Sequence, residues 1–149
     1  MVLEGGTAWY AAQRATAEDL KNIRACYEQI AHFQILGDDD QAAIADAKFH
    51  LAIAEASHNL VLIQMMRGLF DLLQYNVVLG RRKVYTEAHR FDQLHDQHFQ
   101  VMDAIERQDP EAARSAVCGH IEFVVQQVRM IDEEDARRQR ASRLNRIAP

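Results

Sequence analysis

Four polar side chains occupy positions in helical patterns where apolar side chains are expected. Asp46 and His50 lie on one predicted helix, His98 lies on a second, and His120 lies on a third. Burying this much polarity without partners would cost on the order of several kcal/mol, so something must satisfy these groups. Three imidazoles and one carboxylate are donors that a divalent metal ion accepts. The pattern therefore predicts a metal site inside the fold.

The spacing directs the four side chains toward one interior. Asp46 and His50 are four residues apart, which places them one turn apart on the same helix face. His98 and His120 each fall within an apolar stripe of helical spacing. The flanking apolar residues are Leu94 and Met102 for the first, and Val117, Ile121 and Val124 for the second. A single such His is typical of a core histidine, but four donors from three helices are how bundle proteins build metal sites.

This donor set suits Zn, Ni, Mn or Fe(II), with Zn as the first choice. A closed structural Zn site is one alternative, and a metal-dependent hydrolase is another. Glu55-x-x-His58 also matches half of the di-iron bundle signature, but a second copy is missing from the sequence. The sequence contains no HExxH, GxSxG, P-loop or Rossmann glycine pattern, so we do not expect an enzyme.

Two further side chains are candidates for contacting an effector. Arg67, on a predicted fourth helix, could clamp a carboxylate, although a surface Arg is the alternative. His95 lies one turn before His98 beside the same stripe, so it could replace His98 as a ligand or support the site by a hydrogen bond. Cys118 is two residues from His120 and should face away from it, in packing.

The composition argues against several classes of protein. The chain has 149 residues, 48% of them hydrophobic, which suits one domain with a sizeable core. A net charge of −5 argues against a nucleic-acid surface on this piece. Cys26 and Cys118 lack CxxC spacing, which favours reduced thiols in the cytoplasm, and no apolar run is long enough to span a membrane.

Helical patterns cover almost the whole chain and predict an all-α, antiparallel bundle of six or seven helices. Their start signals are a capping box at Thr16–Asp19, carboxylates at 38–40 and the dipeptide Asp109-Pro110, and Gly80 is a plausible stop. The first four predicted helices span residues 3–14, 17–33, 41–56 and 60–79. The fifth begins between residues 84 and 91 and ends before 109, and the sixth spans 110–131. Residues 1–131 form the predicted domain, and 132–149 form a charged helical extension or tail.

Several segments together resemble a known family. They are DAKFHLAIAEASHN from Asp46, HFQVMDAI from His98, DPEAA from Asp109, and His120. This set resembles the FCD effector domain of FadR-type regulators in the GntR family of transcription factors, and the resemblance covers nearly the whole chain. The opening LEGGTAWYAAQRAT, the stretch MRGLFD and the tail DEEDARR look most like the members that control L-lactate utilisation.

The resemblance implies a homodimeric, all-helical sensor whose metal is held by Asp46, His50, His98 and His120. It implies a small 2-hydroxy carboxylate effector, L-lactate first, with glycolate, pyruvate or another organic acid as alternatives. Operator DNA would be bound only through a winged helix-turn-helix domain that normally precedes this one and is absent from this chain. Family members also hold the effector carboxylate with an Arg just ahead of a Leu-Glu pair, where this chain has Met1-Val2.

Overall fold

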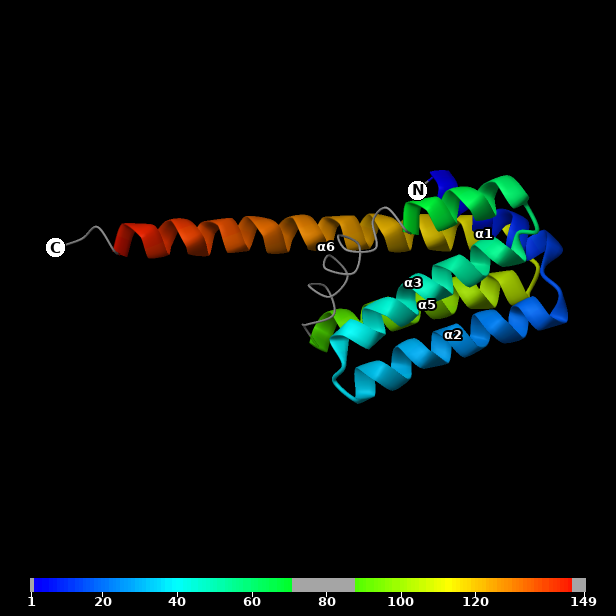
Figure 1. Cartoon of the computed structure of the whole chain (residues 1–149), viewed down its shortest axis with the longest axis horizontal. Helices are drawn as coiled ribbons and strands as arrows, with labels where there is room; N and C mark the ends of the chain where they lie inside the picture. Colours follow the sequence, from blue (N-terminus) through cyan, green and yellow to red (C-terminus); the bar gives the residue numbers. More distant parts are fainter. Residues whose placement is uncertain (1, 71–87, 146–149) are drawn as a thin grey trace.

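The computed structural model describes residues 2–70 and 88–145, and side chains within 2–70 and 92–142. The described residues are helices joined by short turns, so the predicted all-α class is confirmed. The helices are α1 (Val2–Arg14), α2 (Ala17–Ile35), α3 (Asp39–Ala56), a helical segment at residues 60–70, α5 (Ala88–Glu106) and α6 (Pro110–Asn145). Figure 1 shows α1, α2, α3 and α5 gathered around one end of the long α6.

The predicted start signals of three helices are confirmed as caps. The Thr16 side chain accepts from the Asp19 backbone N–H while the Asp19 carboxylate accepts from the Thr16 backbone N–H, which is a capping box. Asp38 accepts from the backbone N–H of Gln41 ahead of α3. Asp109 accepts from the backbone N–H of Ala112 ahead of α6. These bonds satisfy amide groups that a helix start would otherwise leave unpaired.

Helix boundaries differ from the predicted ones by a few residues. Helix α2 ends at Ile35 rather than 33, and α3 begins at Asp39 rather than 41, because Asp38 is its N-cap. The predicted continuation of the fourth helix to 79 and the stop at Gly80 lie outside the described residues.

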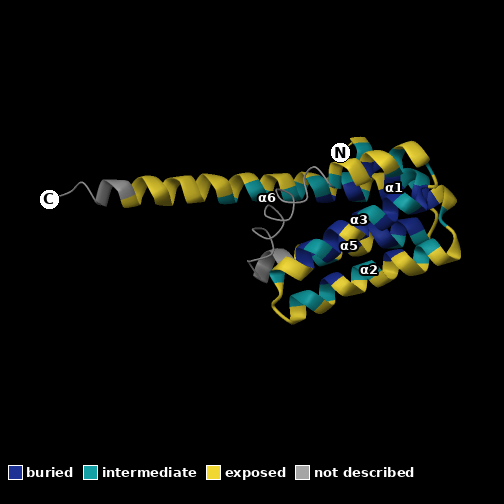
Figure 2. Ribbon diagram, viewed as in Figure 1, coloured by how far each residue is buried: buried dark blue, intermediate teal, exposed yellow. Residues whose placement is uncertain are grey.

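Helix α3 is the centre of the bundle, with eleven of its 18 residues buried. It packs against α1 and α2, while α5 packs against α1, α2 and α6. The buried positions of α3 are mostly alanines, whose small side chains let neighbouring helices approach closely. Figure 2 shows the buried residues concentrated where these helices meet. The interior therefore lies beside α3, where Asp46 and His50 are.

Helix α6 continues well beyond the bundle (Figure 1). Its apolar stripe ends at Ile131, and the described side chains from Glu133 to Ser142 are exposed (Figure 2). A Glu134–Arg138 pair at 2.8 Å, one turn apart, supports the helix there. The helix is continuous across the predicted domain limit at 131, so that limit remains a prediction.

None of the helices among the described residues combines the length and apolar character needed to cross a bilayer.

Candidate metal centre

The structure brings the four predicted donors together at one place in the bundle. Asp46 and His50 come from α3, His98 from α5 and His120 from α6. One ligand atom from each residue lies within 4.8 Å of the corresponding atoms of the other three. The four residues are between 0% and 4% exposed. The four side chains therefore lie close together in the structure, as the apolar stripes predicted.

The local sequence explains why these side chains point inward. Positions 46 and 50 share the buried face of α3 with Ile53, which is 1% exposed. Of the apolar residues that flank the two histidines on α5 and α6, Leu94, Met102 and Val117 are buried. Ile121 and Val124 are partly buried. A polar residue within a buried helical stripe has to follow its neighbours into the core. Packing of the apolar stripe thus positions the donors.

Asp46 is the shared partner of two imidazoles. Its Oδ1 lies 2.7 Å from Nε2 of His98 and 3.7 Å from Nε2 of His50. The His120 ring completes the group, with its centroid 4.4 Å from that of His98 and 5.2 Å from that of His50, nearly parallel to the latter. The arrangement therefore places one carboxyl group beside a cluster of three imidazole rings.

Burial affects the protonation of His50. Removal from water lowers the pKa of His50 from 6.5 to about 4, although the negative charge of Glu4 on α1 acts in the opposite direction. The aromatic ring of Phe49 packs edge-on against His98 and His50, at centroid distances of 5.1 and 5.6 Å, and is itself fully buried. A neutral imidazole keeps a nitrogen lone pair, which is what a metal ion requires.

The dimensions of the group fit a bound divalent ion. Nitrogen and oxygen ligands lie about 2.0 to 2.2 Å from Zn²⁺, so two donors on one ion are at most roughly 4.4 Å apart. The largest separation allowed here, 4.8 Å, exceeds that limit by a few tenths of an ångström. Small side-chain rotations span such a difference. The mixed imidazole and carboxylate donors suit Zn and the other divalent transition metals.

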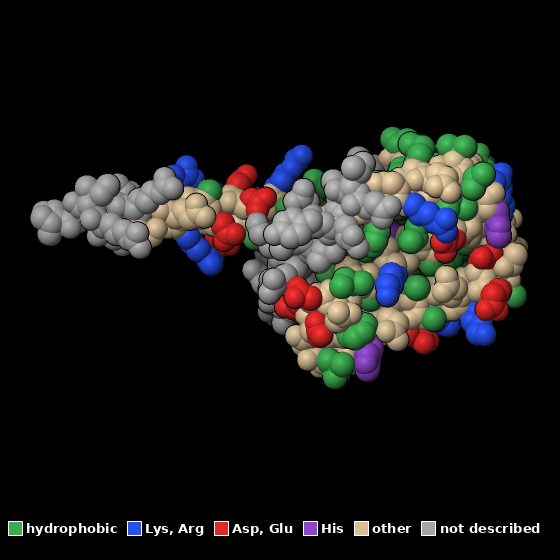
Figure 3. Space-filling model, in the orientation of Figure 1, with side chains coloured by type: hydrophobic (Ala, Val, Ile, Leu, Met, Phe, Trp, Pro, Cys, Tyr) green, Lys and Arg blue, Asp and Glu red, His purple; other side chains and the backbone are tan. Residues whose placement is uncertain are grey.

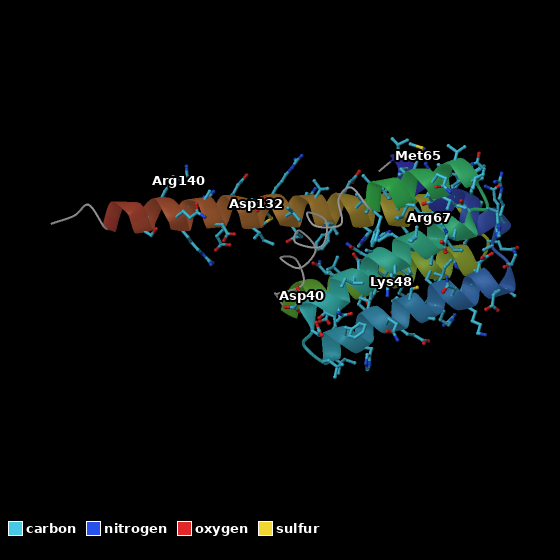
Figure 4. The ribbon with its side chains drawn as sticks, in the orientation of Figure 1. Asp40, Lys48, Met65, Arg67, Asp132 and Arg140 are labelled. Atoms are coloured by element: carbon cyan, nitrogen blue, oxygen red, sulfur yellow. The ribbon has the colours of Figure 1, made fainter. Side chains whose placement is uncertain are left out.

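Two other predicted site residues lie elsewhere. Nε2 of His95 is 2.7 Å from the hydroxyl of Tyr27 on α2, and His95 does not join the group of four. Nη2 of Arg67 is 2.6 Å from Oε1 of Glu55, with the Arg67 side chain about half exposed. Figure 4 shows Arg67 on the outside of the bundle. Their effector contacts remain predictions.

One residue of the site was missed by the sequence reasoning. Oε1 of Gln97 lies 3.1 Å from Nδ1 of His120, across the α5–α6 interface. Gln97 is half-buried and precedes His98, but it is not part of the apolar stripe on which the site prediction was based. The signal available in the sequence was a side chain with a hydrogen-bond acceptor directly before a predicted ligand.

The di-iron alternative does not fit the geometry. Glu55 is paired with Arg67, and Nε2 of His58 is 2.7 Å from Asp19 at the end of the bundle. His58 is also about half exposed, so these two residues do not share a buried site. Among the residues that the structure describes, one group of three or more potential ligands was found, and it is the Asp46 group.

Cys118 was predicted to serve in packing, and in the structure its sulfur lies against α1 at Gly5. A side chain at Gly5 would bring its Cβ within 3.0 Å of the Cys118 sulfur, so the two helices are in close contact there.

Comparison with known proteins identifies relatives along the whole domain. The sequence model of the FCD domain matches residues 1–123. A protein of Escherichia coli (strain K12) described as "Putative L-lactate dehydrogenase operon regulatory protein" is 46% identical over 142 residues, covering 95% of this chain and 54% of that protein. The "Glc operon transcriptional activator" of the same strain is 29% identical, and the match covers 89% of this chain and 54% of that protein. The chain spans about half the length of these curated relatives.

A solved structure has the same fold. E. coli McbR/YncC superposes with a TM-score of 0.68 at 20% sequence identity, covering 89% of this chain and 60% of that one.

Proposed function

The chain belongs to the FCD domain family, and we propose that it is the metal-containing, effector-sensing part of a transcription regulator. The curated relatives reported above are operon regulators and not enzymes, so the hydrolase and di-iron alternatives are set aside. The observation that carries the proposal is the buried group of Asp46, His50, His98 and His120. Such a regulator would act in the cytoplasm, where bacterial operator DNA lies.

We propose that these four side chains hold a divalent metal ion, with Zn²⁺ as the first candidate. Three imidazoles and one carboxylate leave the bound site with a net positive charge. When bound, the ion attracts and coordinates the oxygens of an anion. The chain's own contribution is to fix the four donors within a buried core.

The proposed effector is a small 2-hydroxy carboxylate, with L-lactate as the first candidate. The support is the 46% identity to a relative whose description names L-lactate dehydrogenase. Glycolate, pyruvate or another organic acid is the alternative, since the relative named for the Glc operon is also similar, at 29% identity. Arg67 and His95 remain proposed contacts. To contact an effector, Arg67 would have to break its ion pair with Glu55, and His95 would have to break its hydrogen bond with Tyr27.

We also propose that the chain forms a homodimer. The segment at residues 60–70 carries exposed apolar side chains at helical spacing, namely Leu60, Val61, Met65 and Leu69. Figure 3 shows hydrophobic side chains gathered along the edge of the bundle where this segment lies. Exposed apolar surface of this kind is typical of a protein contact. An effector that favours one packing of the helices would then change the dimer and the DNA-binding domains attached to it.

The metal proposal is tested by metal analysis and zinc titration of the purified protein. The wild type should bind one equivalent of zinc per chain and unfold at a higher temperature with zinc than without it. Asp46→Ala and His120→Ala should lose both effects. His32→Ala, which alters an exposed histidine, is the matched control and should retain them. Undiminished zinc binding by both site variants would refute the assignment.

The effector and dimer proposals have separate tests. Isothermal titration of the zinc-loaded protein with L-lactate, glycolate and pyruvate should give heat with at least one acid, and L-lactate should give the strongest signal. The absence of heat with all three acids would contradict a sensing role.

Sedimentation analysis should show that the wild type is a dimer and that Met65→Glu dissociates it. The control Leu36→Glu changes an exposed side chain in the turn after α2 and should leave the dimer intact.

A further inference from the structure

We propose that Gln97 is the positioning residue that selects which nitrogen of His120 binds the metal. This inference rests on the proposed metal site, whose four ligands do not include Gln97. Its basis is a contact across the α5–α6 interface, where Nδ1 of His120 lies 3.1 Å from Oε1 of Gln97. An amide oxygen can only accept, so this contact is a hydrogen bond when Nδ1 carries the proton.

The chemistry of imidazole makes this bond selective. A neutral imidazole carries one proton, so one ring nitrogen is a donor and the other is an acceptor. If the proton of His120 is on Nδ1 and is held by Gln97, the lone pair is on Nε2. Nε2 of His120 is buried. In His98 and His50, Nε2 is the atom that lies toward Oδ1 of Asp46, at 2.7 and 3.7 Å. The three Nε2 atoms are therefore the consistent set of imidazole ligands.

The orientation of the Gln97 amide matters as much as its position. An amide can present either its oxygen or its NH₂ group to a partner. In the structure the amide oxygen faces Nδ1, and a hydrogen bond in this orientation has its proton on Nδ1. The reversed amide would donate to Nδ1 and favour the proton on Nε2, which would block the metal-binding atom. Gln97 thus supports ligation in one of its two orientations only.

The position of Gln97 also links two of the helices that supply ligands. His98, the next residue on α5, is the ligand from that helix, and its Nε2 lies 2.7 Å from Asp46. The dipeptide Gln97-His98 therefore supplies one ligand directly and orients a second one on α6. A displacement of α5 along α6 would change both interactions together. Supporting partners of this kind typically change metal affinity about 10- to 100-fold when they are removed.

The test compares Gln97→Leu with Gln97→Glu. The leucine variant keeps similar bulk but has no acceptor, whereas the glutamate variant keeps an acceptor at the same place. Gln100→Leu, at an exposed position on the same helix, is the matched control. Zinc affinity, measured by competition with a chelator, should fall about 10- to 100-fold for Gln97→Leu and should stay at or above the wild-type value for Gln97→Glu and Gln100→Leu.

A second measurement distinguishes positioning from a purely structural role. Nitrogen-15 NMR of the imidazoles in the metal-free protein reports which ring nitrogen carries the proton. We expect Nδ1–H at His120 in the wild type and in Gln97→Glu, and a shift toward Nε2–H in Gln97→Leu. Unchanged zinc affinity in Gln97→Leu, or a wild-type His120 protonated on Nε2, would overturn the inference. A wild type that binds no zinc would instead refute the metal site, and the NMR result would still decide the role of Gln97.

Discussion

Acidification should destabilise the metal-free protein through His50, because the buried imidazole resists protonation. Its pKa is lowered from 6.5 to about 4 by burial, against the opposing charge of Glu4. In the unfolded chain the same imidazole is exposed to water and takes up a proton below about pH 6.5. The unfolded state therefore binds more protons than the folded state between pH 6.5 and 4, and stability falls as the pH falls through this range.

The size of the effect follows from the two pKa values. A difference of one pKa unit corresponds to about 1.4 kcal/mol. Between pH 6.5 and pH 5 the His50 contribution should therefore be a loss of about 2 kcal/mol, and above pH 7 it should be close to zero. This is a large part of the stability of an ordinary domain. The carboxylate of Asp46 is closer to His98 than to His50, which leaves burial as the main influence on the His50 ring.

Urea unfolding of the chelator-treated protein at pH 7.5 and pH 5 measures this contribution. The comparison is between the wild type and His50→Gln, which cannot take up the proton, and His32→Gln is the control at an exposed site. The pH-dependent loss should be about 2 kcal/mol smaller in His50→Gln than in the wild type, and unchanged in His32→Gln. An equal loss in the wild type and His50→Gln would show that His50 is not held neutral in the core.

Three further predictions concern the framework of the site. Phe49→Ala removes a fully buried ring that packs on His50 and His98, so urea unfolding should show a loss of about 3 to 5 kcal/mol, and Phe49→Leu should lose less. Thr16→Ala removes the capping bond of α2 and should cost about 1 kcal/mol in the same assay. Deletion of residues 132–149 removes side chains that are exposed where described, so thermal unfolding and zinc affinity should both be unchanged; a clear loss of either would mean that the extension packs on the bundle.

The caps and the inward faces could be predicted from the sequence because they depend on local chemistry. Thr16, Asp38 and Asp109 bond to amide groups three residues away, and such short-range bonds are set by residue type and spacing. His98 and His120 follow apolar neighbours one turn away, so helical periodicity was enough to place them in the core.

The partners of other polar side chains depend on contacts between helices, which periodicity does not specify. His95 is three residues before His98 on α5, which is about 60° away around the helix axis. It contacts Tyr27 on α2 instead of the site. Arg67 pairs with Glu55, twelve residues earlier, because the turn between their helices brings the two surfaces together. The bond from Gln97 to His120 likewise needs the relative positions of α5 and α6. In each case the residue type was compatible with several partners.

The location of the proposed metal explains why a polar group can be kept in the middle of this core. The four side chains lie among buried apolar residues, where hydrophobic side chains of similar size would cost less to bury. An ion that binds only the folded chain offsets that cost, by about 4 kcal/mol at a thousand times its dissociation constant. Because the donors come from α3, α5 and α6, the proposed ion would tie three helices together. An anion that coordinates the ion would therefore act directly on the packing of these helices, which is the coupling that a sensor requires.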